Sequence, residues 1–196
     1  FILATTGNLN LTAGGASVPV TTDGEGKVVI GVQKIRDGLA AGVKGQMNAA
    51  FRRSAFIEVN RSLPLNMLVT FDLPEMKPNC DRRRSTTVVT QSLWFLNDDQ
   101  IIQLTNHLAD RLFAEFPEQQ SDRLHSLFLR LFATKPTIKE HRFVSEFLAH
   151  QEGFFKSDQN PEWQTKLKAQ PEAAGKQALA VLAQLLMASN RFLYID

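Results

Sequence analysis

Six arginines lie between residues 51 and 84, and their side chains are the groups in this sequence best suited to chemistry. Two of them precede a serine at 54, and a run of three at 82–84 precedes the hydroxyl residues 85–87. A guanidinium group can bind a carboxylate or a phosphate through two parallel hydrogen bonds, so such a cluster can form an anion site. The candidate site residues are Arg52, Arg53, Asp72, Arg83, Thr86 and Gln91.

The same arginines also have a structural interpretation. Residues 51–84 hold six Arg and one Lys against four acids, a net charge of +3, so the rest of a chain of net charge +2 carries −1. Pairing with Asp72, Glu75 and Asp81 would tie irregular backbone together without any ligand. We favour this interpretation and keep the anion site as the alternative. Because no aromatic residues alternate with the arginines, we expect no nucleic-acid partner.

Other catalytic and metal-binding patterns are missing from the sequence. It has no G-x-S-x-G motif, no C-x-x-C-H motif and no pair of histidines with zincin spacing. The four histidines, at 107, 125, 141 and 150, lie on or beside the polar faces of expected helices. The single cysteine, Cys80, allows no internal disulfide and no zinc site built from cysteines. We therefore expect no cofactor and no metal, and whether the chain is an enzyme stays open.

The elements that must position these groups begin with a hairpin. Apolar residues at 18–20 and 27–31 flank a turn sequence that contains Asp23 and Gly24, a pair favoured in tight hairpins. For the segments that follow, we expect a loop or frayed helix at 31–50, a short strand at 55–59 and a two-turn helix at 64–71.

From residue 88 onward the apolar residues recur at helical spacing. Asp98 and Asp99 suit a first helical turn, Pro117 should end a helix, and Thr137 with Glu140 forms a capping-box pattern. Ser121 is the expected N-cap of the helix that follows Pro117. Helices are expected at 88–96, 98–116, 121–132, from 137 onward and from 171 onward, with an exposed loop at 156–170. Side chains expected to be buried in the last two helices include Phe143, Val144, Phe147, Leu148, Ala178, Val181, Leu182, Leu185 and Leu186.

These patterns predict a mainly α fold. It consists of a helical bundle in the C-terminal half, a small N-terminal β-hairpin and an irregular Arg/Pro-rich segment. We expect a hairpin and loop region at 1–50, the arginine-rich segment at 51–97 and the bundle at 98–196, forming one compact domain. No apolar run approaches the roughly 18 residues of a membrane helix. The start lacks Met and a basic stretch, so we expect no signal peptide here and a chain that is part of a longer protein.

Several blocks of the sequence also carry a family resemblance, namely FRRSAFIEV, LVTFDLPEMKPNCDRRRSTTVVTQSLWFLND, LADRLF, LFLRLFATKPTIKEH and LLMASNRFLYID. In this order they resemble the C-terminal domain of unknown function of large exported planctomycete-type proteins. In those proteins the domain follows a cytochrome c-like region and a second uncharacterised domain. The resemblance implies a mostly helical fold and a location in the periplasm or at the cell surface. It implies no established reaction and no catalytic residues.

Two hypotheses on function follow. The first is a non-catalytic structural or interaction domain of a larger exported protein, whose partners are the other domains of the same polypeptide. The alternative is part of a hydrolytic or redox enzyme site for polysaccharides, built around the arginine-rich segment. A carbohydrate or an anion is the ligand that such a segment would bind.

Overall fold

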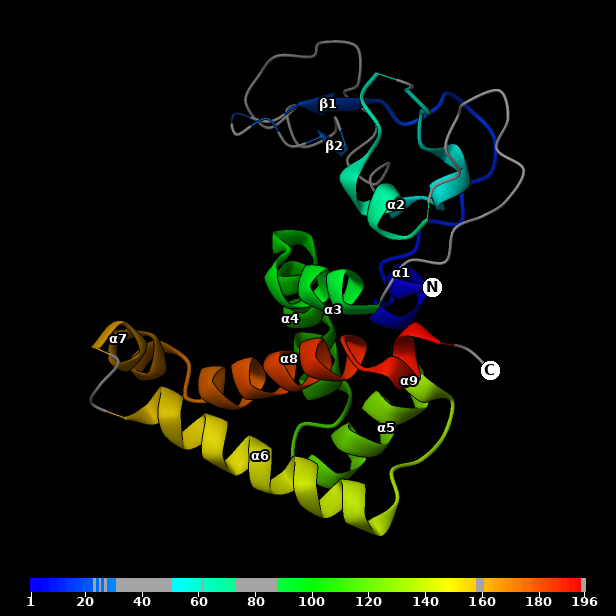
Figure 1. Cartoon of the computed structure of the whole chain (residues 1–196). Coiled ribbons are helices and arrows are strands. Elements are labelled where there is room, and N and C mark those ends of the chain that lie inside the picture. The colour runs from blue at the N-terminus through cyan, green and yellow to red at the C-terminus, as the bar shows by residue number, and fades with distance from the viewer. Residues whose placement is uncertain are drawn as a thin grey trace. The chain divides into compact units, whose positions relative to one another are not determined.

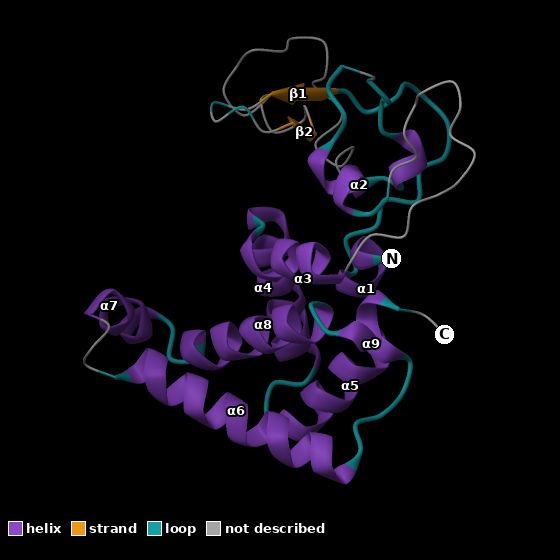
Figure 2. Ribbon diagram, viewed as in Figure 1, coloured by secondary structure: helices purple, strands orange, loops and turns teal. Residues whose placement is uncertain are grey.

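A computed structural model describes residues 1–22, 24, 26, 28–30, 51–60, 62–72, 88–157 and 161–194 of the chain (Figures 1 and 2). The chain divides into two compact units. Residues 1–7 and 88–196 form the helical unit, and residues 8–87 form the hairpin unit. The finer division expected from the sequence, with boundaries near 50 and 97, stays a prediction.

The hairpin unit contains the predicted hairpin. Strands β1 (Val20–Thr22) and β2 (Val28–Ile30) pair antiparallel, with Val20 opposite Ile30. The first strand begins two residues later than expected, because Val18 pairs elsewhere. Its amide donates to Phe56 O (2.7 Å), and its carbonyl accepts from the amide of Glu58 (2.8 Å). The buried side chains Val18, Ile30, Ile57 and Leu65 form the core of this unit.

Residues 55–59 do not form the expected strand. Ser54–Phe56 is instead a short 3-10 helix, η3, and Ile57 makes a single parallel bridge to Val18. Only Ile57 has the strand-like pairing that the alternating side chains at 55–59 predicted. A single bridge is too short to form a strand. A helix is present in the expected place, α2 (Asn66–Thr70), but it is shorter than the expected 64–71 and begins after Leu65 rather than at Pro64. The prediction for 31–50 lies outside the described residues.

The helical unit is built around one central helix. Helix α8 (Ala173–Met187) packs against both α4 (Asp99–Glu115) and α6 (Ile138–Lys156), as Figure 1 shows. The predicted mainly α fold with an N-terminal hairpin is confirmed. The other helices of this unit are α1 (Ile2–Thr6), α3 (Val88–Asn97), α5 (Gln120–Phe132), α7 (Pro161–Ala169) and α9 (Asn190–Leu193). Within the described residues, no helix is both long and apolar enough to cross a membrane.

Small residues among the inward side chains of helix α8 help it to occupy the centre. Ala174, Ala178 and Ala183 are buried along it, and short side chains let neighbouring helix axes approach closely. At Gly175 a β-carbon would lie only 3.2 Å from the ring of Phe113 on α4, so the missing side chain makes room for that aromatic ring. The expectation that Leu185 faces inward is wrong, since its side chain is exposed.

Helix α4 begins and ends where the sequence predicts. The carboxylate of Asp98 accepts hydrogen bonds from the amides of Gln100 (2.9 Å) and Ile101 (3.4 Å), which satisfies two of the free N–H groups at the helix start. The helix ends at Glu115, just before Pro117. The side chains of Ile101, Thr105, Leu108 and Leu112 are buried along one face of the helix.

Helix α6 carries the predicted capping box, in which Thr137 and Glu140 bond to each other's backbone amides. Its inner face is formed by Val144 and Leu148. Phe143 was expected on that face as well, but 69% of its surface is exposed. Helix α6 has 19 residues and α8 has 15, and the position of Phe143 on α6 stays uncovered.

Two further expectations about the helical unit are wrong. Residues 161–169 form helix α7 rather than a loop, since the ring of Trp163 packs on Phe155 at 4.7 Å and this contact outweighs the weak periodicity of the segment. Ser121 is not an N-cap, because α5 begins one residue earlier, at Gln120.

Replacing Leu108 by alanine should lower the free energy of unfolding by about 2–5 kcal/mol, since the side chain is fully buried in α4 and its loss leaves a cavity. Leu129→Ala on α5 is the matched control, because the Leu129 side chain is 46% exposed. Urea denaturation of both variants measures the difference. Similar losses in the two variants would contradict the described core.

Glu140 should make the stability of the chain depend on acid pH. The amide and hydroxyl of Thr137 donate to its carboxylate at 2.7 Å each and lower its pKa below the ordinary value of 4.5, and Arg191 adds to the shift from 2.7 Å. Because the folded pKa is the lower one, the stabilisation is present above pH 4.5 and is lost as pH falls through the folded pKa. Glu140→Gln should therefore lower Tm at pH 7, and its deficit against the parent should shrink at about pH 3.

Thermal melts of the parent, Glu140→Gln and the control Glu146→Gln measure this pH dependence. Glu146 also pairs with an arginine, Arg142, but both side chains are largely exposed, so its replacement should change little at either pH. A Glu140→Gln deficit that stays constant down to pH 3 would contradict the assignment.

Candidate functional site

Arg52 of the hairpin unit is a buried structural contact. Its side chain is 8% exposed, and its Nη1 donates to the carbonyl of Ala16 at 3.0 Å while its Nη2 donates to the carbonyl of Gly14. The guanidinium lies over the ring of Phe56, 4.1 Å from its centre. Arg52 therefore ties the loop at 14–16 to the segment that begins η3.

The donors of Arg52 are directed at backbone rather than at an anion. Two of its nitrogens bond carbonyl oxygens, and its buried Nε has no hydrogen-bond partner among the described residues. A bidentate anion site requires two neighbouring donors that face the same open space. The structural interpretation of this arginine is thus supported, although its partners are carbonyl groups and not the carboxylates expected from the sequence.

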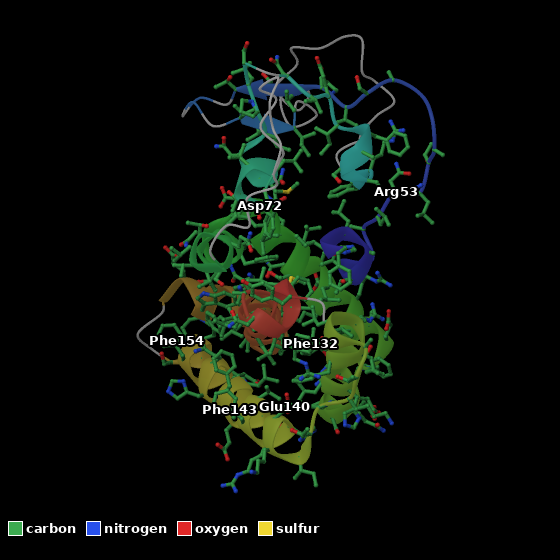
Figure 3. All side chains as sticks on the ribbon, turned by 45° about the vertical axis from the view of Figure 1, so that its right-hand side comes forward. Arg53, Asp72, Phe132, Glu140, Phe143 and Phe154 are labelled. Atoms are coloured by element: carbon green, nitrogen blue, oxygen red, sulfur yellow. The ribbon has the colours of Figure 1, made fainter. Side chains whose placement is uncertain are left out.

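The remaining candidate residues are distributed over both units. Arg53 is exposed, with its guanidinium 6.0 Å from the same Phe56 ring. Asp72 follows α2 with a positive φ of 60°, and Figure 3 shows it well apart from Arg53. Gln91 lies on α3 of the helical unit. Arg83 and Thr86 lie outside the described residues, so an anion site that joins all six residues stays a prediction.

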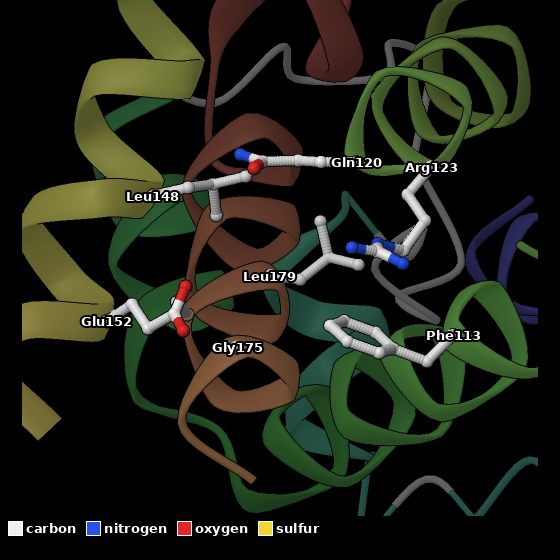
Figure 4. A pocket seen from close by; sticks show the side chains of 8 residues that line it. Phe113, Gln120, Arg123, Leu148, Glu152, Gly175 and Leu179 are labelled. Atoms are coloured by element: carbon white, nitrogen blue, oxygen red, sulfur yellow. The ribbon is translucent and has the colours of Figure 1, made fainter. Parts of the chain in front are cut away.

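A small pocket opens in the helical unit, between α4, α5, α6 and α8 (Figure 4). Its volume of about 30 Å³ is enough for one or two water molecules. Three polar side chains, those of Gln120, Arg123 and Glu152, contribute to its wall together with Phe113, Leu148, Gly175, Ala178 and Leu179. None of the six residues named from the sequence lines this pocket.

Arg123 in this pocket closes the end of α4. Its Nη1 donates to the carbonyls of Phe116 (2.5 Å) and Pro117 (2.9 Å), and its guanidinium stacks on the ring of Phe113 at 4.1 Å. Burial lowers the pKa of Arg123, while the charges of Glu172 and Glu152 act in the opposite direction. The side chain stays charged, and the arrangement provides a helix cap rather than a substrate pocket.

Helix α3 presents an apolar surface outward. It contains no charged residue, and Val89, Leu93 and Leu96, which lie on one side at helical spacing, are 66%, 52% and 39% exposed. Its opposite side is anchored by Phe95, which is 1% exposed. The helix also carries Thr90, Gln91, Ser92 and Asn97, so it is uncharged but not apolar on every side. Its three neighbouring exposed apolar side chains are suited to contact another protein surface.

Helix α6 also exposes aromatic side chains, but among charges. Phe143 and Phe154 point outward in Figure 3, and two ion pairs on the same helix, Arg142–Glu146 and Lys156–Glu152, keep its surface polar. Single apolar residues within a charged surface are common in soluble proteins. Of the two exposed faces, the uncharged one on α3 is the stronger candidate for a contact surface.

No catalytic constellation and no metal site of three or more side-chain ligands stands out in the part of the chain that the structure describes. There, no three His, Cys, Asp or Glu side chains gather closely enough to hold an ion together. Sequence patterns could not reveal the outer face of α3, because the spacing of Val89, Leu93 and Leu96 equals that of a buried face. The absence of any charge in residues 88–97 was the available signal.

Comparison with known families gives one match. The sequence profile of the PSD1 family, described as "Protein of unknown function (DUF1553)", matches residues 1–148 of the chain. No curated protein and no solved structure matches it significantly.

Replacing Arg52 by alanine should lower the free energy of unfolding by about 2–4 kcal/mol, because the buried guanidinium loses its two hydrogen bonds to the carbonyls of Gly14 and Ala16. Arg53→Ala is the matched control. Because the Arg53 side chain is exposed, its replacement should change the free energy of unfolding by less than about 0.5 kcal/mol. Chemical denaturation of both variants tests the difference. An Arg52→Ala chain of parental stability that had lost sulfate binding would instead support the anion site.

Proposed function

This chain belongs to the PSD1 family of proteins of unknown function (DUF1553), and we propose that it is a non-catalytic interaction domain of a larger exported protein. The observation that carries the proposal is the outer face of α3, formed by Val89, Leu93 and Leu96. Its partner is another domain of the same polypeptide, which covers this face with apolar side chains of its own.

Two arguments support an apolar partner within the same polypeptide. Since α3 has no charged residue, it offers a partner no ion pair, and the contact must be stabilised by burial of apolar surface at about 25 cal/mol per Å². The resemblance of the chain to C-terminal domains of planctomycete-type proteins supplies the second argument. In such proteins a cytochrome c-like domain and a further domain share the polypeptide, in the periplasm or at the cell surface.

The alternative of a polysaccharide enzyme site gains no support from the described residues. A deep pocket around Arg52, Arg53, Asp72, Arg83 and Gln91 would favour it. Arg52 instead bonds backbone carbonyls, and the pocket that the structure does describe is lined by other residues and holds little more than water.

Thiol labelling can test whether α3 is covered in the longer protein. Leu93→Cys is made in a Cys80→Ser background, in this chain alone and in the full-length gene product. Leu129→Cys on α5 is the matched control, because the leucine side chains there and at 93 are exposed to similar degrees, 46% and 52%. Labelling at position 93 should slow at least about tenfold in the full-length product, since a buried thiol reacts slowly, while labelling at position 129 should not change.

The outcomes separate clearly. Equal labelling rates at position 93 in the two proteins would contradict the proposal, and so would a full-length gene product that contains no domain besides this chain. Circular dichroism of each variant checks that the cysteine has not unfolded the helical unit.

A further inference from the structure

Two histidines that are 16 residues apart in the sequence meet where α5 approaches α6. The ring centroids of His125 and His141 lie 5.7 Å apart, with the ring planes inclined at 55°. The Nε2 of His141 is 3.2 Å from the hydroxyl of Ser121, one turn before His125 on α5. Both imidazoles are partly exposed, so an ion from solvent can reach them.

We propose that His125 and His141 form a bidentate site for a divalent transition-metal ion, and that this ion is Zn²⁺. Neutral imidazole is the commonest protein ligand of zinc, at a Zn–N distance of about 2.0–2.1 Å. Each ring centre then lies about 3 Å from the ion, so two rings that share a tetrahedral ion have centroids roughly 5 Å apart. The observed separation of 5.7 Å is close to this value.

The surroundings of the pair suit a solvent-exposed site. The ion would take over from Ser121 as the partner of His141 Nε2, and the serine hydroxyl can turn to solvent because Ser121 is exposed. Water molecules would complete the coordination, since the described residues offer no third histidine, cysteine or carboxylate ligand there. Binding would link two helices that are joined in the chain by residues 133–137.

Isothermal titration of ZnCl2 into the chelator-treated chain tests this site. A Cys80→Ser background removes the thiol as a competing ligand. We expect one Zn²⁺ per chain, and at least about tenfold weaker binding in both His125→Ala and His141→Ala. The chain has four histidines, so His107→Ala and His150→Ala are matched controls that should bind as the parent does.

A ligand replacement separates loss of the site from loss of the fold. His125→Cys should retain zinc binding, because a thiolate is also a zinc ligand, and melting in the presence of EDTA should show all variants folded. Absence of zinc binding in the parent would overturn the proposal. Equal weakening in the His107→Ala or His150→Ala controls would do the same, since it would indicate nonspecific surface binding.

Discussion

The close approach of helices to α8 is the constraint on which the helical unit depends. Ala174, Gly175, Ala178 and Ala183 leave little side chain between the helix axes, while Leu179, Leu182 and Met187 of the same helix are also buried. Leu108 and Leu112 of α4 and Leu148 of α6 add further buried apolar side chains. This combination of small and large residues lets the helices pack closely. It also fixes which residues of α5 and α6 remain outward, including the two histidines that meet there.

Once this packing is set, polar side chains serve mainly to satisfy backbone groups. Arg123 binds the carbonyls that follow α4, and Arg52 binds two loop carbonyls in the hairpin unit. Unsatisfied buried backbone groups cost about 1–3 kcal/mol each, so an arginine with several donors is an efficient partner where no regular hydrogen-bonding pattern exists. A concentration of arginines in an irregular segment is therefore weak evidence for a ligand. The partner atoms decide between ligand and cap, and they can be identified only in three dimensions.

The sequence predicted the features that depend on neighbouring residues. The capping box at Thr137 and Glu140 is a local interaction and is confirmed. Of the two acids expected in the first turn of α4, Asp99 lies there and Asp98 is the N-cap. The predictions for Phe143 and Leu185 failed because periodicity identifies residues that share a face but not whether another helix covers that face. The contacts of Arg52 and the meeting of His125 with His141 join separate segments, and no motif spacing encodes them.

The outer face of α3 has a property that an accidental apolar patch would lack, namely a rigid support. The hydroxyl of Ser92 donates to the carbonyl of Ala188 (2.9 Å), and the amide of Gln184 donates to the carbonyls of Phe95 and Leu96 at 3.0 and 2.9 Å. These bonds close the C-terminal end of α3 and fasten the helix to α8 and the residue after it. A surface that is already ordered loses little conformational entropy when a partner covers it. The same bonds make α3 a poor candidate for a mobile lid. Its apolar residues are thus held in place, as the proposed contact with an apolar domain requires.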